Sequence, residues 1–230
     1  MRTRGVLFDV DGTLVDSGYI HAVCWWQALR QHGHDIPTAL IHRSVGMGGD
    51  QLVPHVLGKA ADDMDADELS ALIASHDALY ATYWDRLQPL PGARELVRRC
   101  HDAGLSTVLA SSASSTELGV LRAVLDLDDV LDHVTSSDDS EASKPDPGLV
   151  EVALDKAGLQ PHEMVFLGDS VWDVQAAAKA GVECLGVECG GTSEAELREA
   201  GATDVFRNPA DLLERWAHTP LGTSQKGHDA

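Results

Sequence analysis

Basic residues are scarce in this chain of 230 residues. Lysine and arginine together number 17 against 37 aspartate and glutamate residues, which leaves a formal charge of −20. A charge of this sign repels nucleic-acid phosphates and anionic lipid headgroups. The composition therefore argues against a nucleic-acid partner and against binding to a membrane surface.

Long apolar runs are also missing, since no stretch of the sequence approaches the ~20 residues that a membrane span requires. Met1–Gly5 leads directly into a strand-like run rather than into the apolar segment of a signal peptide. The 4 cysteines are scattered without a Cys-x-x-Cys pair, and the 11 histidines form no His-Glu-x-x-His motif. Free thiols and a cytoplasmic location are the expectation for such a chain.

The first third of the chain combines one strand with a helical segment. Gly5–Val10 is a short apolar run that ends in acids, as is typical of a buried parallel strand. Gly18–Arg86 shows helical periodicity instead, with helices expected over Tyr19–Gln31 and Ala66–Tyr83. Asp65 is placed to cap the second of these helices. This segment therefore predicts a small helical unit inserted after the first strand.

Helices and strands alternate in the rest of the chain. The expected strands are Ser106–Ala110, Asp132–Thr135, Met164–Leu167, Cys184–Val187 and Asp204–Phe206. The expected helices are Ala93–Ala103, Ser115–Leu125, Gly148–Ala157, Val171–Ala180 and Ala210–Ala217. This order predicts the α/β class, with a doubly wound, Rossmann-like parallel sheet covered on both faces. We expect residues 1–16 and 88–217 to form this core, residues 17–87 a helical cap and residues 218–230 a flexible tail.

Polar side chains cluster after the predicted strands. In a doubly wound sheet, the loops at the carboxyl ends of the strands form the site. Each residue alone has a structural alternative, such as a hairpin turn, a helix cap or a solvated lysine. Their joint occurrence at one sheet edge favours a site. The residues are Asp9, Asp11, Ser111, Ser112, Lys144, Asp169 and Asp173.

These residue types fit phosphoryl chemistry. Clustered carboxylates suit Mg²⁺, which prefers one or two carboxylates together with water and phosphate oxygens. One carboxylate can attack while a second exchanges protons with the leaving oxygen. The hydroxyl groups and the ammonium group can neutralise and orient an anionic group such as phosphate.

The motifs resemble those of a known family. Asp9-x-Asp11-Gly12-Thr13, Ser111, Lys144-Pro145 and Gly168-Asp169-Ser170-x-x-Asp173 are similar, in order and spacing, to the four motifs of the haloacid dehalogenase superfamily. The resemblance extends from about Val6 to Phe206. The helical insertion resembles the C1 cap of the phosphoglycolate phosphatase and β-phosphoglucomutase-like branch.

The resemblance implies a role for each core residue. It makes Asp9 the nucleophile that forms an aspartyl-phosphate, and Asp11 the general acid and base. Ser111 and Lys144 would bind the transferring phosphoryl group, and Ser112 is included among the substrate-binding residues. Mg²⁺ would be held by Asp9, the backbone carbonyl of Asp11 and Asp169, with Asp173 as an orienting residue behind them.

The resemblance also bears on the cap. His21 and Trp25, four residues apart, share a helix face, and in this branch that face meets the core near Asp11. The segment Arg43–Asp50 matches the substrate-specificity loop of the cap, so His21 and Arg43 are candidate substrate-binding residues. The mutases of the branch carry an arginine where this chain has Gly49, and tend to have glutamate where it has Gly168.

These observations predict an Mg²⁺-dependent phosphatase that acts on a small phosphorylated metabolite, of the phosphoglycolate or sugar phosphate type. A β-phosphoglucomutase-like mutase is the alternative. A 2-haloacid dehalogenase and a non-catalytic relative rank lower, because the dehalogenases usually lack an acid at the position of Asp11. The protein is expected to be a monomer or a homodimer.

Overall fold

The computed structural model describes residues 3–61 and 64–223, and a six-stranded parallel sheet forms the centre of the protein. The strands are β1 Gly5–Phe8, β2 Ser106–Ala110, β3 His133–Thr135, β4 Met164–Gly168, β5 Glu183–Val187 and β6 Asp204–Phe206. Their order is β3-β2-β1-β4-β5-β6, which places β1 in the middle between β2 and β4. The predicted doubly wound α/β class is confirmed.

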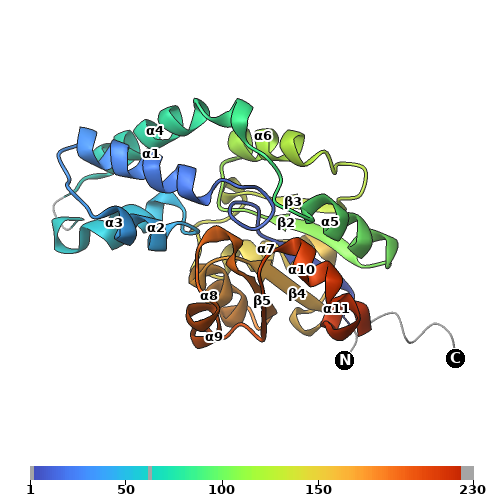
Figure 1. Cartoon of the computed structure of the whole chain (residues 1–230). Helices are drawn as coiled ribbons and strands as arrows, with labels where there is room; N and C mark the ends of the chain where they lie inside the picture. Colours follow the sequence, from blue (N-terminus) through green and yellow to red (C-terminus); the bar gives the residue numbers. More distant parts are fainter. Residues whose placement is uncertain (1–2, 62–63, 224–230) are drawn as a thin grey trace, which may run out of the picture.

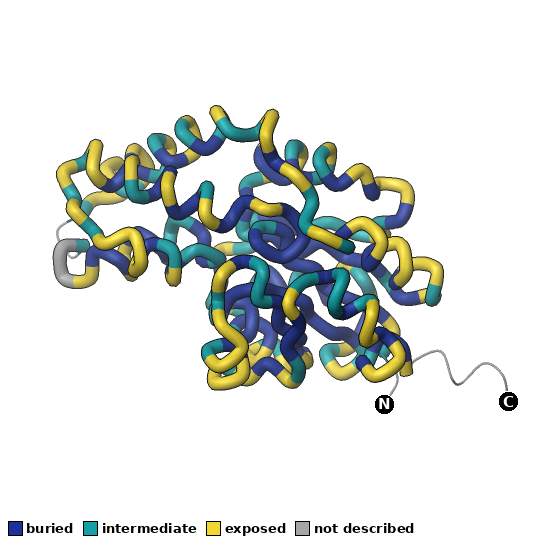
Figure 2. The backbone as a smooth tube through the Cα atoms, viewed as in Figure 1, coloured by how far each residue is buried: buried dark blue, intermediate teal, exposed yellow. Residues whose placement is uncertain are grey.

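Helices cover both faces of the sheet (Figure 1). One face carries α5 Ala93–Asp102, α6 Ser115–Leu125 and α10 Pro209–Glu214, and the other carries α7 Gly148–Ala157, α8 Val171–Lys179 and α9 Glu194–Ala200. Alternation along β1 explains the two layers, because Val6 and Phe8 pack into the first face and Leu7 into the second. The strands are buried throughout their central parts (Figure 2). None of the helices in the described ranges is long and apolar enough to cross a membrane.

A separate group of helices lies beside the sheet (Figure 1). It consists of α1 Gly18–Gln31, α2 Thr38–Ser44, α3 Gly49–Leu57 and α4 Ala66–Ala81. These helices share a hydrophobic cluster of their own, which includes Trp25, Leu29, Ile41, Leu52 and Leu72. The predicted cap of α4 is confirmed, since the Asp65 side chain accepts a hydrogen bond of 2.8 Å from the Glu68 N–H. We call this group the cap helices.

Two adjacent segments connect the cap helices to the sheet. The backbone N–H of Asp16 donates to the Gln88 carbonyl at 2.9 Å, and that of Leu90 donates to the Leu14 carbonyl at 2.8 Å. The outgoing and returning segments therefore run side by side, on the carboxyl side of β1. The division of the chain at residues 17 and 87 follows these segments and remains a proposal.

The end of the chain differs from the expected flexible tail. Residues 220–223 form the short helix α11, Pro220–Thr223, and Leu221 is buried in the same hydrophobic cluster as Phe8. The Thr219 hydroxyl donates to the Trp216 carbonyl at 2.8 Å. The prediction is wrong for residues 218–223, because Thr219, Leu221 and Gly222 are buried beside Trp216. Residues 224–230 lie outside the described residues.

Replacement of Leu221 tests this packing. Leu221 is fully buried, so Leu221→Ala leaves a cavity and is expected to lower the free energy of unfolding by about 2–4 kcal/mol. Urea denaturation measures the difference, with the exposed Leu40→Ala on α2 as the control. Equal stabilities of the two variants would show that α11 does not pack against the core.

Candidate active site

The loop after β1 turns two carboxylates toward the same sheet edge. Asp9 continues the strand, and its N–H donates to the Leu167 carbonyl at 2.9 Å. Gly12 follows with a φ of +78°, a conformation that glycine adopts without strain. A Cβ at Gly12 would lie 2.6 Å from an oxygen of Asp169, so the close approach of the two loops also requires glycine. Asp9 and Asp11 consequently line one cavity.

Lys144 lies beneath this edge and is fully buried. Its Nζ is 2.6 Å from Asp9 Oδ1 and 2.8 Å from Asp173 Oδ1. Burial lowers the pKa of Lys144, but the charges of Asp173 and Asp9 outweigh burial and leave the pKa above its ordinary value. Lys144 is therefore a permanent cation that holds the Asp9 carboxylate in place.

Three carboxylates form a group in which oxygens of Asp9, Asp169 and Asp173 lie within 4.8 Å of one another. The Thr13 hydroxyl lies 3.0 Å from Asp9 Oδ2 and 3.1 Å from Asp169 Oδ1, so it supplies one proton to two acceptors. Burial, with the charges of neighbouring acids, raises the pKa of Asp9 to about 7 and that of Asp169 well above its ordinary range. This excess of buried negative charge fits a divalent cation.

Asp173 is the member of the group with the most protein contacts. Its Oδ2 accepts hydrogen bonds from the Ser170 N–H at 3.0 Å and from the Ser170 hydroxyl at 2.7 Å, within the capping box of α8. Its Oδ1 faces Lys144. Asp173 is therefore placed to orient Lys144, whereas Asp9 Oδ2 and Asp169 Oδ1 share the single Thr13 hydroxyl and keep lone pairs that a cation could use.

The two serines after β2 occupy different positions. Ser111 is fully buried, and its Oγ accepts a hydrogen bond of 3.0 Å from the Ala113 N–H. Ser112 lines the cavity, and its Oγ lies 3.4 Å from the Gly46 carbonyl of the cap helices' loop. Ser112 is therefore the serine that lines the cavity. Ser111, which the resemblance placed on the phosphoryl group, is not among the described residues that line it.

His21 reaches Asp11 from the first turn of α1. Its Nε2 lies 3.2 Å from Asp11 Oδ1, which also accepts a hydrogen bond of 2.6 Å from the Ser17 hydroxyl. Burial raises the pKa of Asp11, but the charge and the hydrogen bond of His21 outweigh burial and leave this pKa below its ordinary value. Burial lowers the pKa of His21, but the charge of Asp11 outweighs burial and leaves that pKa above its ordinary value. These shifts favour a carboxylate at Asp11 and an imidazolium at His21, with the His21 Nε2–H directed at Asp11.

A second histidine continues this contact toward solvent. His21 Nδ1 lies 3.2 Å from His76 Nε2, and His76 Nδ1 lies 2.9 Å from Asp77 Oδ1. Burial lowers the pKa of His76 to about 4, so this ring is neutral and can accept from His21 while it donates to Asp77. Stacking fixes both rings, with Trp25 centred 4.0 Å from His76 and Tyr80 centred 3.9 Å from His21.

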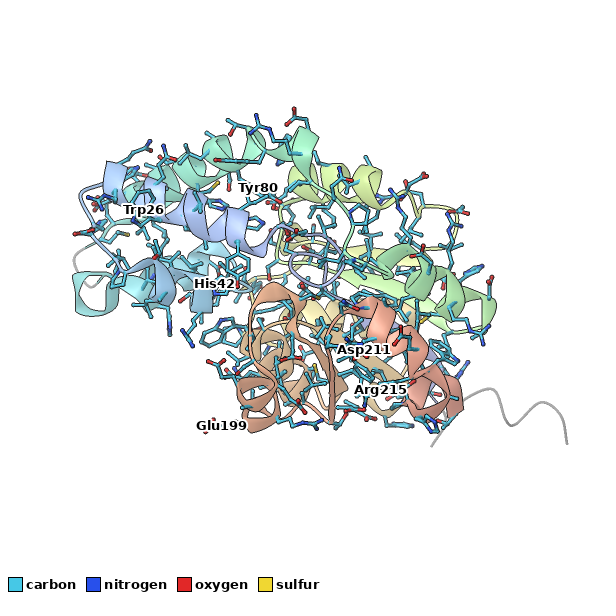
Figure 3. All side chains as sticks on the ribbon, in the orientation of Figure 1. Trp26, His42, Tyr80, Glu199, Asp211 and Arg215 are labelled. Atoms are coloured by element: carbon cyan, nitrogen blue, oxygen red, sulfur yellow. The ribbon has the colours of Figure 1, made fainter. Side chains whose placement is uncertain are left out.

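The cap helices close over a cavity of about 320 Å³. His42 lies where they meet the core, with its Nε2 3.1 Å from the Gly190 carbonyl (Figure 3). Asp50 Oδ2 accepts from the Ser143 N–H at 3.2 Å on the other side. The volume is that of a site for a small molecule.

Arg43 does not reach this cavity. Its guanidinium is paired with Glu196 at 3.1 Å on the protein surface, and its carbonyl accepts from the Trp172 indole N–H at 2.9 Å. The predicted substrate-binding role of Arg43 has no counterpart in this geometry. Arg43 joins the cap helices to α8 and α9 instead.

The chain is similar to a known protein family and to several solved structures. The family model "haloacid dehalogenase-like hydrolase" matches residues 3–181. The chain belongs to the haloacid dehalogenase-like hydrolase family. It is 31% identical to phosphoglycolate phosphatase of Yersinia pestis over 91% of each chain. A hydrolase from Pseudomonas syringae has a TM-score of 0.87 at 29% identity, covering 94% of this chain and 99% of that one. A putative β-phosphoglucomutase from Bacteroides vulgatus shares the fold, with a TM-score of 0.86 at 23% identity and coverage of 98% and 91%.

These findings confirm the family and the branch that the motifs indicated, and they support a phosphatase. Several cavity residues nevertheless lie outside the four motifs of the haloacid dehalogenase-like hydrolases, and the sequence reasoning missed them. They are His76, Asp77 and Glu117. His76 alone gave a signal, since it follows Leu72 and precedes Tyr80 by four residues on the buried face of α4.

Proposed function

We propose that the protein is a Mg²⁺-dependent phosphatase that hydrolyses a small phosphorylated metabolite, of the phosphoglycolate or sugar phosphate type, through an aspartyl-phosphate. One observation carries the proposal. Asp9 is held at 2.6 Å by a buried lysine at the base of a cavity of about 320 Å³, and Asp11 paired with His21 faces the same cavity. A fixed nucleophile beside a proton-exchanging pair is the arrangement that two-step hydrolysis of an ester requires.

The two steps follow from these positions. A carboxylate oxygen of Asp9 attacks phosphorus, and the bond between phosphorus and the ester oxygen breaks as Asp11 protonates that oxygen. His21 supplies the proton that Asp11 transfers, because the two groups are in hydrogen-bond contact. In the second step Asp11 removes a proton from water, which attacks phosphorus and frees Asp9. The closed cap helices exclude bulk water while the first step occurs.

The residues at the edge fit a magnesium ion. Asp9, Asp169 and the backbone carbonyl of Asp11 would hold it, and the ion would neutralise charge on the phosphoryl oxygens. Lys144 adds a second positive charge beside Asp9. Asp173 keeps Lys144 in this position through a contact of 2.8 Å.

Two glycines favour a hydrolase over a mutase. A Cβ at Gly49 would lie 2.9 Å from Ile73 and 3.0 Å from Trp25, where the mutases place an arginine. A Cβ at Gly168 would lie 2.5 Å from the Cβ of Asp173, where the mutases tend to have glutamate. Neither longer side chain fits without displacing its neighbours. The arginine that would grip a second phosphate is therefore lacking at Gly49, and the glutamate typical of the mutases is lacking at Gly168. The cytoplasmic location and the monomeric or homodimeric state remain predictions.

Metal removal tests this function. After treatment with a chelator, the protein is expected to release no phosphate from para-nitrophenyl phosphate or from a panel of glycolate, pentose and hexose phosphates, and Mg²⁺ is expected to restore release. Mg²⁺ without substrate should raise the melting temperature, since it relieves repulsion among buried carboxylates. Ca²⁺ and Na⁺ serve as controls. Full activity in the chelator would contradict the proposal.

A further inference from the structure

The cavity is strongly acidic outside the position proposed for the phosphoryl group. Within residues 3–61 and 64–223, no lysine or arginine lines it, and Lys144 lies buried beneath Asp9. The wall beyond Asp9 and Asp11 carries Asp50, Asp77, Glu117 and Glu141. Burial raises the pKa of Glu117 to about 7, so its negative charge is complete only above that pH. The alcohol part of a bound substrate would therefore face negative charge.

Glu117 is an unusual member of this group because it is almost completely buried. It lies in the first turn of α6 and is 9% exposed, and its Oε1 has no hydrogen-bond partner among the residues that the structure describes. His21 Nε2 lies 3.4 Å from this oxygen but 3.2 Å from Asp11 Oδ1, and it carries a single proton. A buried acceptor without a partner is costly unless a ligand supplies a donor.

Three features of the cavity could attract an anion, and each is offset by an acidic residue. The charge of His21 is paired with Asp11. The amino ends of α3 and α6 also face the cavity, but Asp50 and Glu117 lie in the first turns of these helices. None of the three leaves net positive charge for a carboxylate or for a second phosphate.

We propose that the preferred substrate is a phosphomonoester whose alcohol part carries no negative charge and presents hydroxyl or ammonium hydrogen-bond donors to Glu117 and Asp77. This proposal rests on the proposed phosphatase function and narrows its substrate class. Phosphoglycolate, whose alcohol part bears a carboxylate, is then a poor substrate, as are bisphosphates. Like charges across a closed, partly desolvated contact disfavour binding.

A matched two-carbon series tests the charge preference. Phosphoglycolate, ethylene glycol monophosphate and O-phosphoethanolamine have the same length and carry a carboxylate, a hydroxyl or an ammonium group. With the Mg²⁺-loaded enzyme, kcat/KM for each of the last two is expected to exceed that for phosphoglycolate by about tenfold or more. The difference should lie in KM, because the carboxylate is repelled in the ground state as well as in the transition state.

Variants that each remove one acidic group of the cavity test whether these acids cause the substrate preference. Glu117→Gln keeps the shape of the side chain, and it is expected to reduce the preference over phosphoglycolate severalfold by lowering KM for the carboxylate. Asp77→Asn makes the same test at an exposed position, and the amide oxygen can still accept the hydrogen bond from His76 Nδ1. Glu199→Gln is the matched control, since Glu199 is an exposed residue of α9 (Figure 3) and is not among the described residues that line the cavity. It should leave the ratio unchanged.

The outcomes separate this inference from the proposed function. If para-nitrophenyl phosphate is hydrolysed but phosphoglycolate is preferred to the other two, the charge preference is overturned and the phosphatase stands. The charge preference is also overturned if Glu117→Gln and Asp77→Asn change the ratio of kcat/KM values no more than Glu199→Gln does. If no phosphomonoester is hydrolysed with Mg²⁺, the proposed function fails, and this inference fails with it.

Discussion

Asp9→Asn is expected to reduce phosphate release by at least ~10³-fold while the protein stays folded. The carboxamide has nearly the same shape, but its oxygen is a poor nucleophile toward phosphorus. Lys144 retains Asp173 at 2.8 Å as a partner, so the buried cation is not left alone. Steady-state phosphate release measures the loss, and urea denaturation shows that the fold is retained.

A control variant tests whether the loss of activity is specific to Asp9. Asp16→Asn makes the same chemical change at an exposed position seven residues further along the chain, next to the segment that joins the cap helices to the sheet. It is expected to keep activity within about twofold of the unchanged protein, as surface substitutions usually have small effects. Near-normal turnover in Asp9→Asn would refute the role assigned to Asp9.

Lys144→Met is expected to lower the free energy of unfolding by about 3–5 kcal/mol and to abolish activity. Lys144 is fully buried between Asp9 and Asp173. Its removal leaves two buried carboxylates without a cation, and methionine fills the space without restoring charge. Urea denaturation of the Mg²⁺-free protein measures the change.

Two further variants separate charge from packing. Asp173→Asn combined with Lys144→Met removes one of the two orphaned carboxylates, so it should recover part of the lost stability. Lys156→Met breaks a half-exposed ion pair with Asp139 and should cost less than about 1 kcal/mol. If Lys144→Met is no less stable than Lys156→Met, the buried ion pairs do not have the structural role assigned to them.

The core elements were predictable because their signals are local. Strands β1, β2, β4 and β5 contain short apolar runs, and the first four core helices carry apolar residues at helical spacing with glycine or another stop at the end. The short helices α2, α3 and α9 have seven to nine residues, which is too short for such a pattern to stand out. The tail was mispredicted for the same reason, since α11 has only four residues and its single large apolar side chain is Leu221.

The candidate site likewise has one part that was predictable from the sequence and one part that was not. Asp9, Asp11 and Asp169 follow strands, and Lys144 lies in the segment that leads into α7. The topology of the sheet therefore brings them to one edge regardless of the details of packing. The acidic wall depends instead on how the cap helices sit on the core. Glu117 occupies an ordinary first-turn position of α6, and only the approach of α1 turns it into a buried group beside the cavity.

The most direct test of the central claim is mass spectrometry of the phosphorylated enzyme. Asp11→Asn should be mixed with para-nitrophenyl phosphate and Mg²⁺ and quenched in acid. Para-nitrophenolate leaves without a proton, so Asp9 is phosphorylated, but the variant cannot activate water for the second step. We predict phosphate on the peptide that contains Asp9, and none in Asp9→Asn. Phosphate on another residue, or product formation without a phosphorylated peptide, would contradict the account.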